Sequence, residues 1–236
     1  MRVLLAVLVV GIAGCGGGSS PPAQTADADP VAALKKLGAK IERNEQGVVV
    51  EVRMTGGYGS QITDGGPGTR EITDAGLVHL KGLTNLQTLN LSFNKITDLG
   101  LGHLKGMTKL ETLSLERTKI TDAGLAHLKG MTKLQDLTIG GTKITDAGLV
   151  HLKGLPNLQT LFLGGTKITD AGLVHLKGLT KMQNLTIGGT KITDAGLVHL
   201  KGLTSLVFLF LIETQITDAG IADLKMALPD CKIIVW

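Results

Sequence analysis

Residues 86–98 read Leu86-Gln-Thr-Leu89-Asn-Leu91-Ser-Phe-Asn94-Lys-Ile96-Thr-Asp98, and close variants of this stretch return along the chain. Its Ile-Thr-Asp triplet recurs at a constant step of 24 residues, beginning at Ile72, Ile96, Ile120, Ile144, Ile168, Ile192 and Ile216. Six full copies therefore occupy residues 72–215. A constant period in the twenties is typical of a solenoid, in which each repeat forms one coil.

Each copy contains the signals of a strand and of a short helix. The segment Leu89–Leu91 alternates apolar and polar residues, as expected of a strand with one buried face. Asp74 is predicted to cap the start of a helix, and Leu77 and Leu80 share one face of that helix. Gly82 suits the left-handed position that follows a helix. One copy cannot bury its own leucines, so the copies must stack on one another.

The spacing Leu86-x-x-Leu89-x-Leu91-x-x-Asn94-x-Ile96 resembles the consensus of leucine-rich repeat proteins. The block Ile-Thr-Asp-Ala-Gly-Leu is most similar to the subclass found in ribonuclease-inhibitor-like and F-box-associated repeats. The resemblance implies an α/β fold: a leucine-rich repeat solenoid, or horseshoe, with a parallel concave sheet and short convex helices. One departure is that threonine replaces the asparagine in later copies, at Thr118, Thr142, Thr166, Thr190 and Thr214. A threonine hydroxyl bonds fewer backbone groups than an asparagine amide, which affects the expected curvature but not the fold.

Both ends of the array are expected to be caps that shield its terminal leucines. The N-terminal cap, residues 30–71, should hold a helix from Pro30 to about Leu37, two strands (Lys40–Arg43 and Val48–Met54) and a glycine-rich insertion. The C-terminal cap is residues 216–236. There a one-residue insertion is expected to place Cys231 and Trp236 at leucine positions.

The first 29 residues are predicted to direct export and membrane attachment rather than to form a folded domain. A basic start and a short apolar run over residues 1–14 are typical of a signal peptide and are too short to span a bilayer. Ile12-Ala-Gly-Cys15 resembles the lipobox of bacterial lipoproteins, which implies cleavage before Cys15 and lipidation of that residue. Residues 15–29 then form a flexible tether. The alternative is an ordinary buried helix with an incidental cysteine.

Composition excludes several classes of protein. The net charge of +4 is mild, and four Phe, one Tyr and one Trp are too few for base-stacking modules, so we expect no nucleic-acid partner. Once Cys15 is lipidated, Cys231 has no partner, so the chain is not a disulfide scaffold.

A search for catalytic motifs finds like residues repeated along a line. All six histidines occupy one repeat position, at His79, His103, His127, His151, His175 and His199, and are expected on the outer helices rather than around a metal. Two lysine columns, which start at Lys81 and Lys95, are expected to be solvated faces. Phosphate-loop, zinc-protease and serine-hydrolase motifs do not occur in the sequence. Catalysis needs unlike residues converging at one place, so we expect no enzyme, no cofactor and no metal.

Strand residues that alternate with the leucines should point into the concave face. The repeats differ from one another mainly at these positions, which are small and polar in early copies and apolar in late ones. The predicted ligand-binding residues are Phe162, Phe208, Phe210, Ile212, Asn90, Glu116 and Asp136, and Ile233 and Val235 are expected to extend the apolar part. Clustered aromatic side chains are typical of binding hot spots.

The sequence therefore predicts a non-enzymatic scaffold for protein–protein interaction, lipid-anchored in the bacterial cell envelope, either periplasmic or surface-exposed. The expected partners are an unknown protein ligand and the membrane, through the lipid on Cys15. A monomer or a weak homodimer is expected. Two alternatives stay open: binding of glycan or peptidoglycan along the Thr/Ser/Asn rows, and a purely structural repeat protein that dimerises through its apolar end.

Overall fold

The computed structural model describes residues 29–56 and 72–235. The strands are β1 (Lys40–Arg43), β2 (Val49–Arg53), β3 (Thr88–Asn90), β4 (Thr112–Ser114), β5 (Asp136–Thr138), β6 (Thr160–Phe162), β7 (Asn184–Thr186), β8 (Phe208–Phe210) and β9 (Lys232–Ile234). The helices are α1 (Pro30–Lys36), α2 (Asp74–Leu77), α3 (Asp98–Leu101), α4 (Asp122–Leu125), α5 (Asp146–Leu149), α6 (Asp170–Leu173), α7 (Asp194–Leu197) and α8 (Asp218–Ala227). Short 3₁₀ helices extend five of them, over Val78–Leu80, Gly102–Leu104, Ala126–Leu128, Val150–Gly154 and Val174–Leu176.

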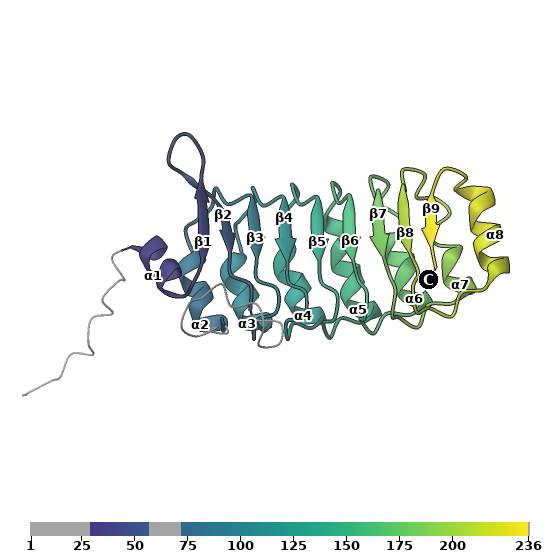
Figure 1. Cartoon of the computed structure of the whole chain (residues 1–236), viewed down its shortest axis with the longest axis horizontal. Helices are drawn as coiled ribbons and strands as arrows, with labels where there is room; N and C mark the ends of the chain where they lie inside the picture. Colours follow the sequence, from purple (N-terminus) through teal and green to yellow (C-terminus); the bar gives the residue numbers. More distant parts are fainter. Residues whose placement is uncertain (1–28, 57–71, 236) are drawn as a thin grey trace, which may run out of the picture.

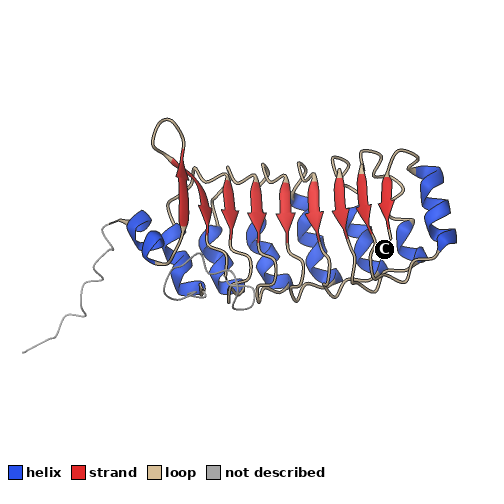
Figure 2. Cartoon of the chain, in the orientation of Figure 1, coloured by secondary structure: helices blue, strands red, loops and turns tan. Residues whose placement is uncertain are grey.

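The described strands form a single sheet in sequence order. Helices α2 to α7 line one face of this sheet, and α1 and α8 lie at its two ends (Figures 1 and 2). β1 and β2 form an antiparallel hairpin, and every later pair of neighbours is parallel. The register keeps the 24-residue step, so that Leu113 of β4 pairs with Leu137 of β5. The predicted solenoid with a parallel sheet and short outer helices is confirmed.

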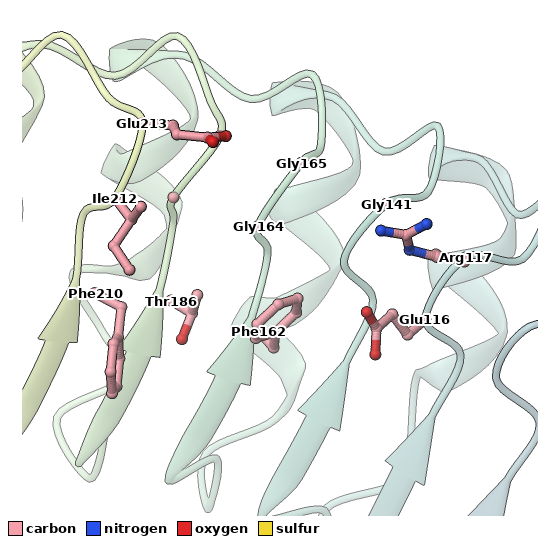
Figure 3. Close-up of a pocket in the computed structure, with 12 residues that line it drawn as sticks. Glu116, Arg117, Gly141, Phe162, Gly164, Gly165, Thr186, Phe210, Ile212 and Glu213 are labelled. Carbon is pink, nitrogen blue, oxygen red and sulfur yellow. The ribbon is translucent and has the colours of Figure 1, made fainter. Parts of the chain in front are cut away.

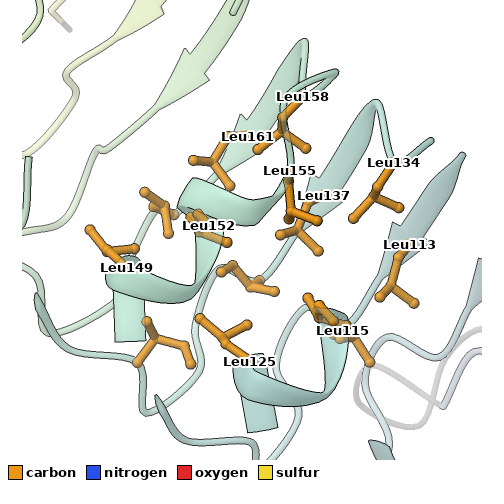
Figure 4. Packing of buried hydrophobic residues seen from close by; sticks show 14 of the residues in the cluster. Leu113, Leu115, Leu125, Leu134, Leu137, Leu149, Leu152, Leu155, Leu158 and Leu161 are labelled. Carbon is orange, nitrogen blue, oxygen red and sulfur yellow. The ribbon is translucent and has the colours of Figure 1, made fainter. Parts of the chain in front are cut away.

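The core is a set of leucine columns between the sheet and the helices (Figure 4). Leu137 from a strand, Leu149 from a helix and Leu155 from the following loop each have no exposed surface. Each coil contributes the same positions, so every column continues into the next repeat. Burial between stacked coils, rather than within one, supplies the hydrophobic stabilisation.

The Ile-Thr-Asp-Ala-Gly-Leu block links neighbouring coils, and this corrects the prediction that its aspartate caps the helix. The N-cap of α5 is Thr145, and the aspartate that follows it is the first helical residue. Both oxygens of the Asp122 carboxylate accept from Thr145 in the next coil, Oδ1 from the backbone N–H at 2.8 Å and Oδ2 from the hydroxyl at 2.6 Å. The same pair of bonds recurs from Asp74 to Asp194.

These bonds also explain the glycine of the block. A Cβ atom at Gly148 would overlap the carboxylate of Asp122, so the glycine leaves the room that the inter-coil bonds need. At the end of the series, hydrogen bonds from Thr217 lower the pKa of Asp194. The bond from the Thr217 hydroxyl has the larger effect, and the bond from its backbone N–H has the smaller one.

Asn94 bonds more backbone groups than the threonines at the equivalent positions do. The Asn94 side chain accepts from Ile72 N and donates to the carbonyls of Met54, Leu91 and Ser92. The threonine that replaces it donates only to the carbonyl three residues earlier, as Thr118 does to Leu115 at 2.7 Å.

The N-terminal cap has the predicted helix and hairpin, with Asp29 accepting from Val31 N at the start of α1. Its glycine-rich insertion lies almost wholly in 57–71, outside the described residues. The predicted signal, Cys15 and all of the predicted tether except Asp29 lie in 1–28, also outside them. Within the described ranges, no helix combines the length and the apolar character needed to cross a bilayer.

The predicted one-residue insertion is present in the C-terminal cap, but it does not extend into β9. Cys231 N donates to Leu228 O as Leu206 N does to Leu203 O 25 residues earlier, so Cys231 takes a leucine position, as predicted. Hydrogen bonds from Lys232 N to Val207 O and from Leu211 N to Ile234 O return β9 to the ordinary 24-residue register, so the expected frame of this strand is wrong by one residue. Ile233 therefore pairs with the core residue Leu209 and does not belong to the concave face, and Val235 falls on the next core column, although it is 41% exposed. Lys232 and Ile234 take the concave positions instead. Cys231 is buried, as predicted, and burial raises the pKa of its thiol.

Candidate binding site

The concave face of the sheet carries two side-chain columns, one at each end of the three-residue strands. The first column includes Thr112, Asp136 and Phe208, and the second includes Phe162 and Phe210. Parallel pairing in constant register places the members of a column side by side. The three phenylalanines are half-buried rather than fully exposed.

A hollow of about 780 Å³ lies where strands β4 to β8 end (Figure 3). Its lining comes from five successive coils and consists of Glu116, Arg117, Gly141, Phe162, Gly164, Gly165, Thr186, Gly188, Gly189, Phe210, Ile212 and Glu213. Charged residues stand at its two ends, and aromatic and aliphatic side chains lie between them. Pockets of this size and apolar character with a few polar groups are typical of binding sites.

Pairs of glycines create the hollow. Gly141, Gly165 and Gly189 occupy one column just past the strands, with φ of +64°, +68° and +65°. In the same column, Arg117 and Glu213 adopt the same left-handed backbone at +52° and +57°. A side chain in this conformation costs about 1–2 kcal/mol, and glycine avoids that cost. Arg117 and Glu213 therefore occupy positions where glycine would have a lower conformational energy.

The floor is aromatic. A Cβ atom at Gly140 would overlap the ring of Phe162, so this ring occupies the space that the missing side chain leaves. Phe210 stacks on Phe208, with ring centroids 6.3 Å apart and planes inclined by 21°. Lys232 Nζ lies 5.5 Å from the centroid of the Phe208 ring. The apolar floor thus continues from the hollow towards the C-terminal end of the sheet.

The structure brings together four of the predicted site residues in the lining of the hollow: Phe162, Phe210, Ile212 and Glu116. Phe208 adjoins them through its stack on Phe210. Asn90 and Asp136 lie apart, Asn90 bonding Ser92 N and Asp136 accepting from Thr112 at 3.4 Å. Whether these residues bind a ligand stays a prediction.

Sequence reasoning missed Arg117 and Glu213, because they lie one residue beyond the strand positions that alternate with the leucines. The aligned repeats do contain a signal that could have identified Arg117 and Glu213. Their column holds glycine in three successive copies and charged residues on either side, at Arg117 and Glu213.

The histidine column lies half-buried on the outer helices. In the part of the chain that the structure describes, no group of three or more His, Cys, Asp or Glu side chains is placed to hold a metal ion. His127 instead sits beside Gly102 of the preceding coil, where an added Cβ would be 3.9 Å from the imidazole ring.

Comparisons with known proteins agree with this architecture. A family model described as leucine rich repeats in two copies matches residues 84–130, and a leucine rich repeat model matches residues 108–168. A search among curated proteins gives no match. The solved structure of an internalin C2 from Listeria monocytogenes is 24% identical over 89% of this chain and 93% of its own, with a TM-score of 0.56. An internalin F from the same organism is 25% identical over 72% of this chain and 67% of its own, with a TM-score of 0.39.

The matched repeats, the constant register and the likeness to the first of these structures identify the fold as a leucine-rich repeat solenoid.

Proposed function

We propose that this chain is a non-enzymatic scaffold that binds a partner protein on its concave face, held in the bacterial envelope by a lipid anchor. Leucine-rich repeat domains generally mediate protein–protein interaction. The observation that carries the proposal is the hollow with its aromatic floor, built where the repeats depart from one another. Buried or half-buried aromatic rings in such a pocket are typical binding hot spots.

The lining favours binding over catalysis. None of the residues that line the hollow is a histidine, cysteine or lysine, and its one hydroxyl is that of Thr186. Acyl-transfer and hydrolytic sites need a nucleophile beside a base, and the lining offers no such pair.

Replacement of Phe208 and Phe210 by serine tests the binding patch. We expect Phe208→Ser with Phe210→Ser to leave the circular-dichroism spectrum and melting curve nearly intact, because both rings are half-buried on the open face of the sheet. Capture of proteins from envelope extract, analysed by mass spectrometry, should be lost. Unfolding of the variant would show that the rings belong to the core, and unchanged capture would contradict the assignment of the patch.

The polar rows give less support to the glycan alternative. Their side chains already pair across strands, as Thr112 does with Asp136 and Asn184 with Thr160. Retention of purified wall polymer by the phenylalanine variant would nevertheless favour that alternative.

The anchor rests on the resemblance of Ile12–Cys15 to a lipobox. We expect Cys15→Ala to leave an unprocessed chain or to release the protein from membranes. Fractionation with detergent partitioning, followed by mass measurement of the first residue, checks this. A variant that partitions and migrates like the parent would exclude the lipoprotein assignment.

A further inference from the structure

The segment between each outer helix and the next strand carries lysine at two repeat positions. The first position is lysine in every copy, and the second is lysine in three copies. Together they form a lysine rim, which consists of Lys81, Lys105, Lys109, Lys129, Lys133, Lys153, Lys177, Lys181 and Lys201. All of these side chains are exposed except Lys201, which is half-buried and pairs with Asp223 at 2.7 Å.

Hydrogen bonds between neighbouring coils hold these segments in register. Two residues after Lys133, the N–H of Gln135 donates to the carbonyl of Glu111 in the preceding coil at 2.8 Å. Within the second lysine column, Lys109 Nζ donates to Asn85 Oδ1 of the preceding coil at 2.6 Å. Neighbours in a column therefore lie side by side, at a spacing of about 5 Å near the sheet, and the rim is about 25 Å long.

The acidic side chains of the Ile-Thr-Asp blocks lie at the other end of the outer helices. Asp122 begins α4, and Lys129 follows the last 3₁₀ residue seven positions later. That helical stretch is about 10 Å long, more than the Debye length of about 8 Å at physiological salt. Glu111 and Asp136 lie nearer to the rim, but both are half-buried. The exposed charge of the rim from Lys81 to Lys177 is therefore positive.

The residues between the two lysine columns are small and uncharged. Gly106 and Gly130 have open space where a Cβ atom would stand, and the exposed Thr108 and Thr132 follow two residues later. Lysine ammonium and threonine hydroxyl groups are common contacts of phosphate oxygens. Lysine acts on a phosphate as a point charge without a directional fork, so such a surface selects a ligand by its density of negative charge.

The rim is a line along one edge of the sheet, where strands β3 to β9 begin. The turn of the β1–β2 hairpin projects past this edge (Figure 1). A flat bilayer laid on the rim would meet that turn first, whereas a polymer chain can run beside it from coil to coil. Residues 81–87 and their equivalents in the later copies contain no aromatic side chain apart from the strands, so nucleic-acid bases would find no stacking partner.

We propose that the lysine rim binds a linear polymer that carries a phosphate group in each repeating unit and lies across successive coils. Each coil supplies one or two ammonium groups, and most coils add a threonine hydroxyl. Binding neutralises a row of like charges that otherwise repel one another. The inference goes beyond the proposed function and does not depend on it, because the hollow lies at the opposite ends of the strands.

Inorganic polyphosphate, labelled with a fluorophore at one end, tests the proposal by fluorescence anisotropy with the purified full-length chain. The rim variant combines Lys105→Gln, Lys109→Gln, Lys129→Gln and Lys133→Gln. The matched control removes the same charge at the other edge of the sheet, past the strand ends, by Lys119→Gln, Lys143→Gln, Lys167→Gln and Lys191→Gln. All of the replaced lysines are exposed, so circular dichroism and thermal unfolding should be alike for the three proteins.

At physiological salt the rim variant should bind polyphosphate at least about tenfold more weakly than the parent, with a shallower dependence of affinity on salt. The control should stay within about threefold of the parent. Equal losses in the two variants would reduce the effect to net charge and overturn the proposal, as would a parent that does not bind.

Vesicles of phosphatidylglycerol and phosphatidylcholine provide the second arm. Any lipid on Cys15 is common to the three proteins, so it does not affect the comparison between them. Vesicle binding that the rim variant loses, in a parent that does not bind polyphosphate, would assign the rim to a lipid surface and overturn the proposal.

Discussion

Leu137→Asp is expected to destabilise the protein by about 4 kcal/mol or more, the largest effect of any single change considered. Leu137 is fully buried in β5, where it pairs with the leucines of β4 and β6. The substitution removes a core side chain and places a carboxylate where no cation lies in the leucine column. Because stability in a solenoid is shared between neighbouring coils, disruption in the middle of the array should weaken both sides.

Urea denaturation followed by circular dichroism measures this effect. Lys129→Ala is the control, because Lys129 is exposed at the end of an outer 3₁₀ helix, and it should change the free energy of unfolding by no more than about 0.5 kcal/mol. Equal stability of Leu137→Asp and the parent would mean that the leucine columns do not form the core.

Gly148→Ala is expected to cost about 2–4 kcal/mol, even though it adds a single methyl group. The new Cβ would overlap the carboxylate of Asp122, which must then give up its bonds to the N–H and hydroxyl of Thr145. Hydrogen bonds to a charged group are stronger than neutral ones, and both bonds join one coil to the next.

Gly178→Ala provides a matched control. Gly178 lies in the loop after α6, its φ is not positive, and an added Cβ would have no atom within 4 Å. This change should be neutral or stabilising by about 0.4–1 kcal/mol. Similar thermal unfolding of the two alanine variants would show that the aspartate bonds do not link the coils.

The repeat period alone predicts the leucine columns, because a constant step puts equivalent residues in register once the coils stack. The role of Asp122 escaped the same reasoning. Aspartate is a preferred N-cap residue, so local preference indicates a cap, whereas its partner Thr145 lies 23 residues away in the next coil. At the C-terminus, Cys231 takes the leucine position that the predicted insertion gives it, but the backbone bonds of β9 restore the 24-residue period, which periodicity before the strand does not reveal.

The candidate site could likewise be predicted from the sequence only in part. Alternation along the strands predicts that Phe162 and Phe210 face the concave side. The hollow itself depends on backbone conformation one residue beyond the strands, where Gly165 leaves space and Arg117 accepts a strained φ. Such conformations leave no mark in hydrophobic periodicity.

The central claim is that a partner protein binds the concave face, and a comparison of two double variants tests it most directly. Phe208→Ser with Phe210→Ser alters the concave face, and Val150→Ser with Val174→Ser alters the convex helices, where each valine is 41% exposed. Both folded proteins are offered the same envelope extract, and the captured proteins are quantified. Capture should be lost with the concave variant and kept with the convex one, and loss with the convex variant alone would contradict binding on the concave face.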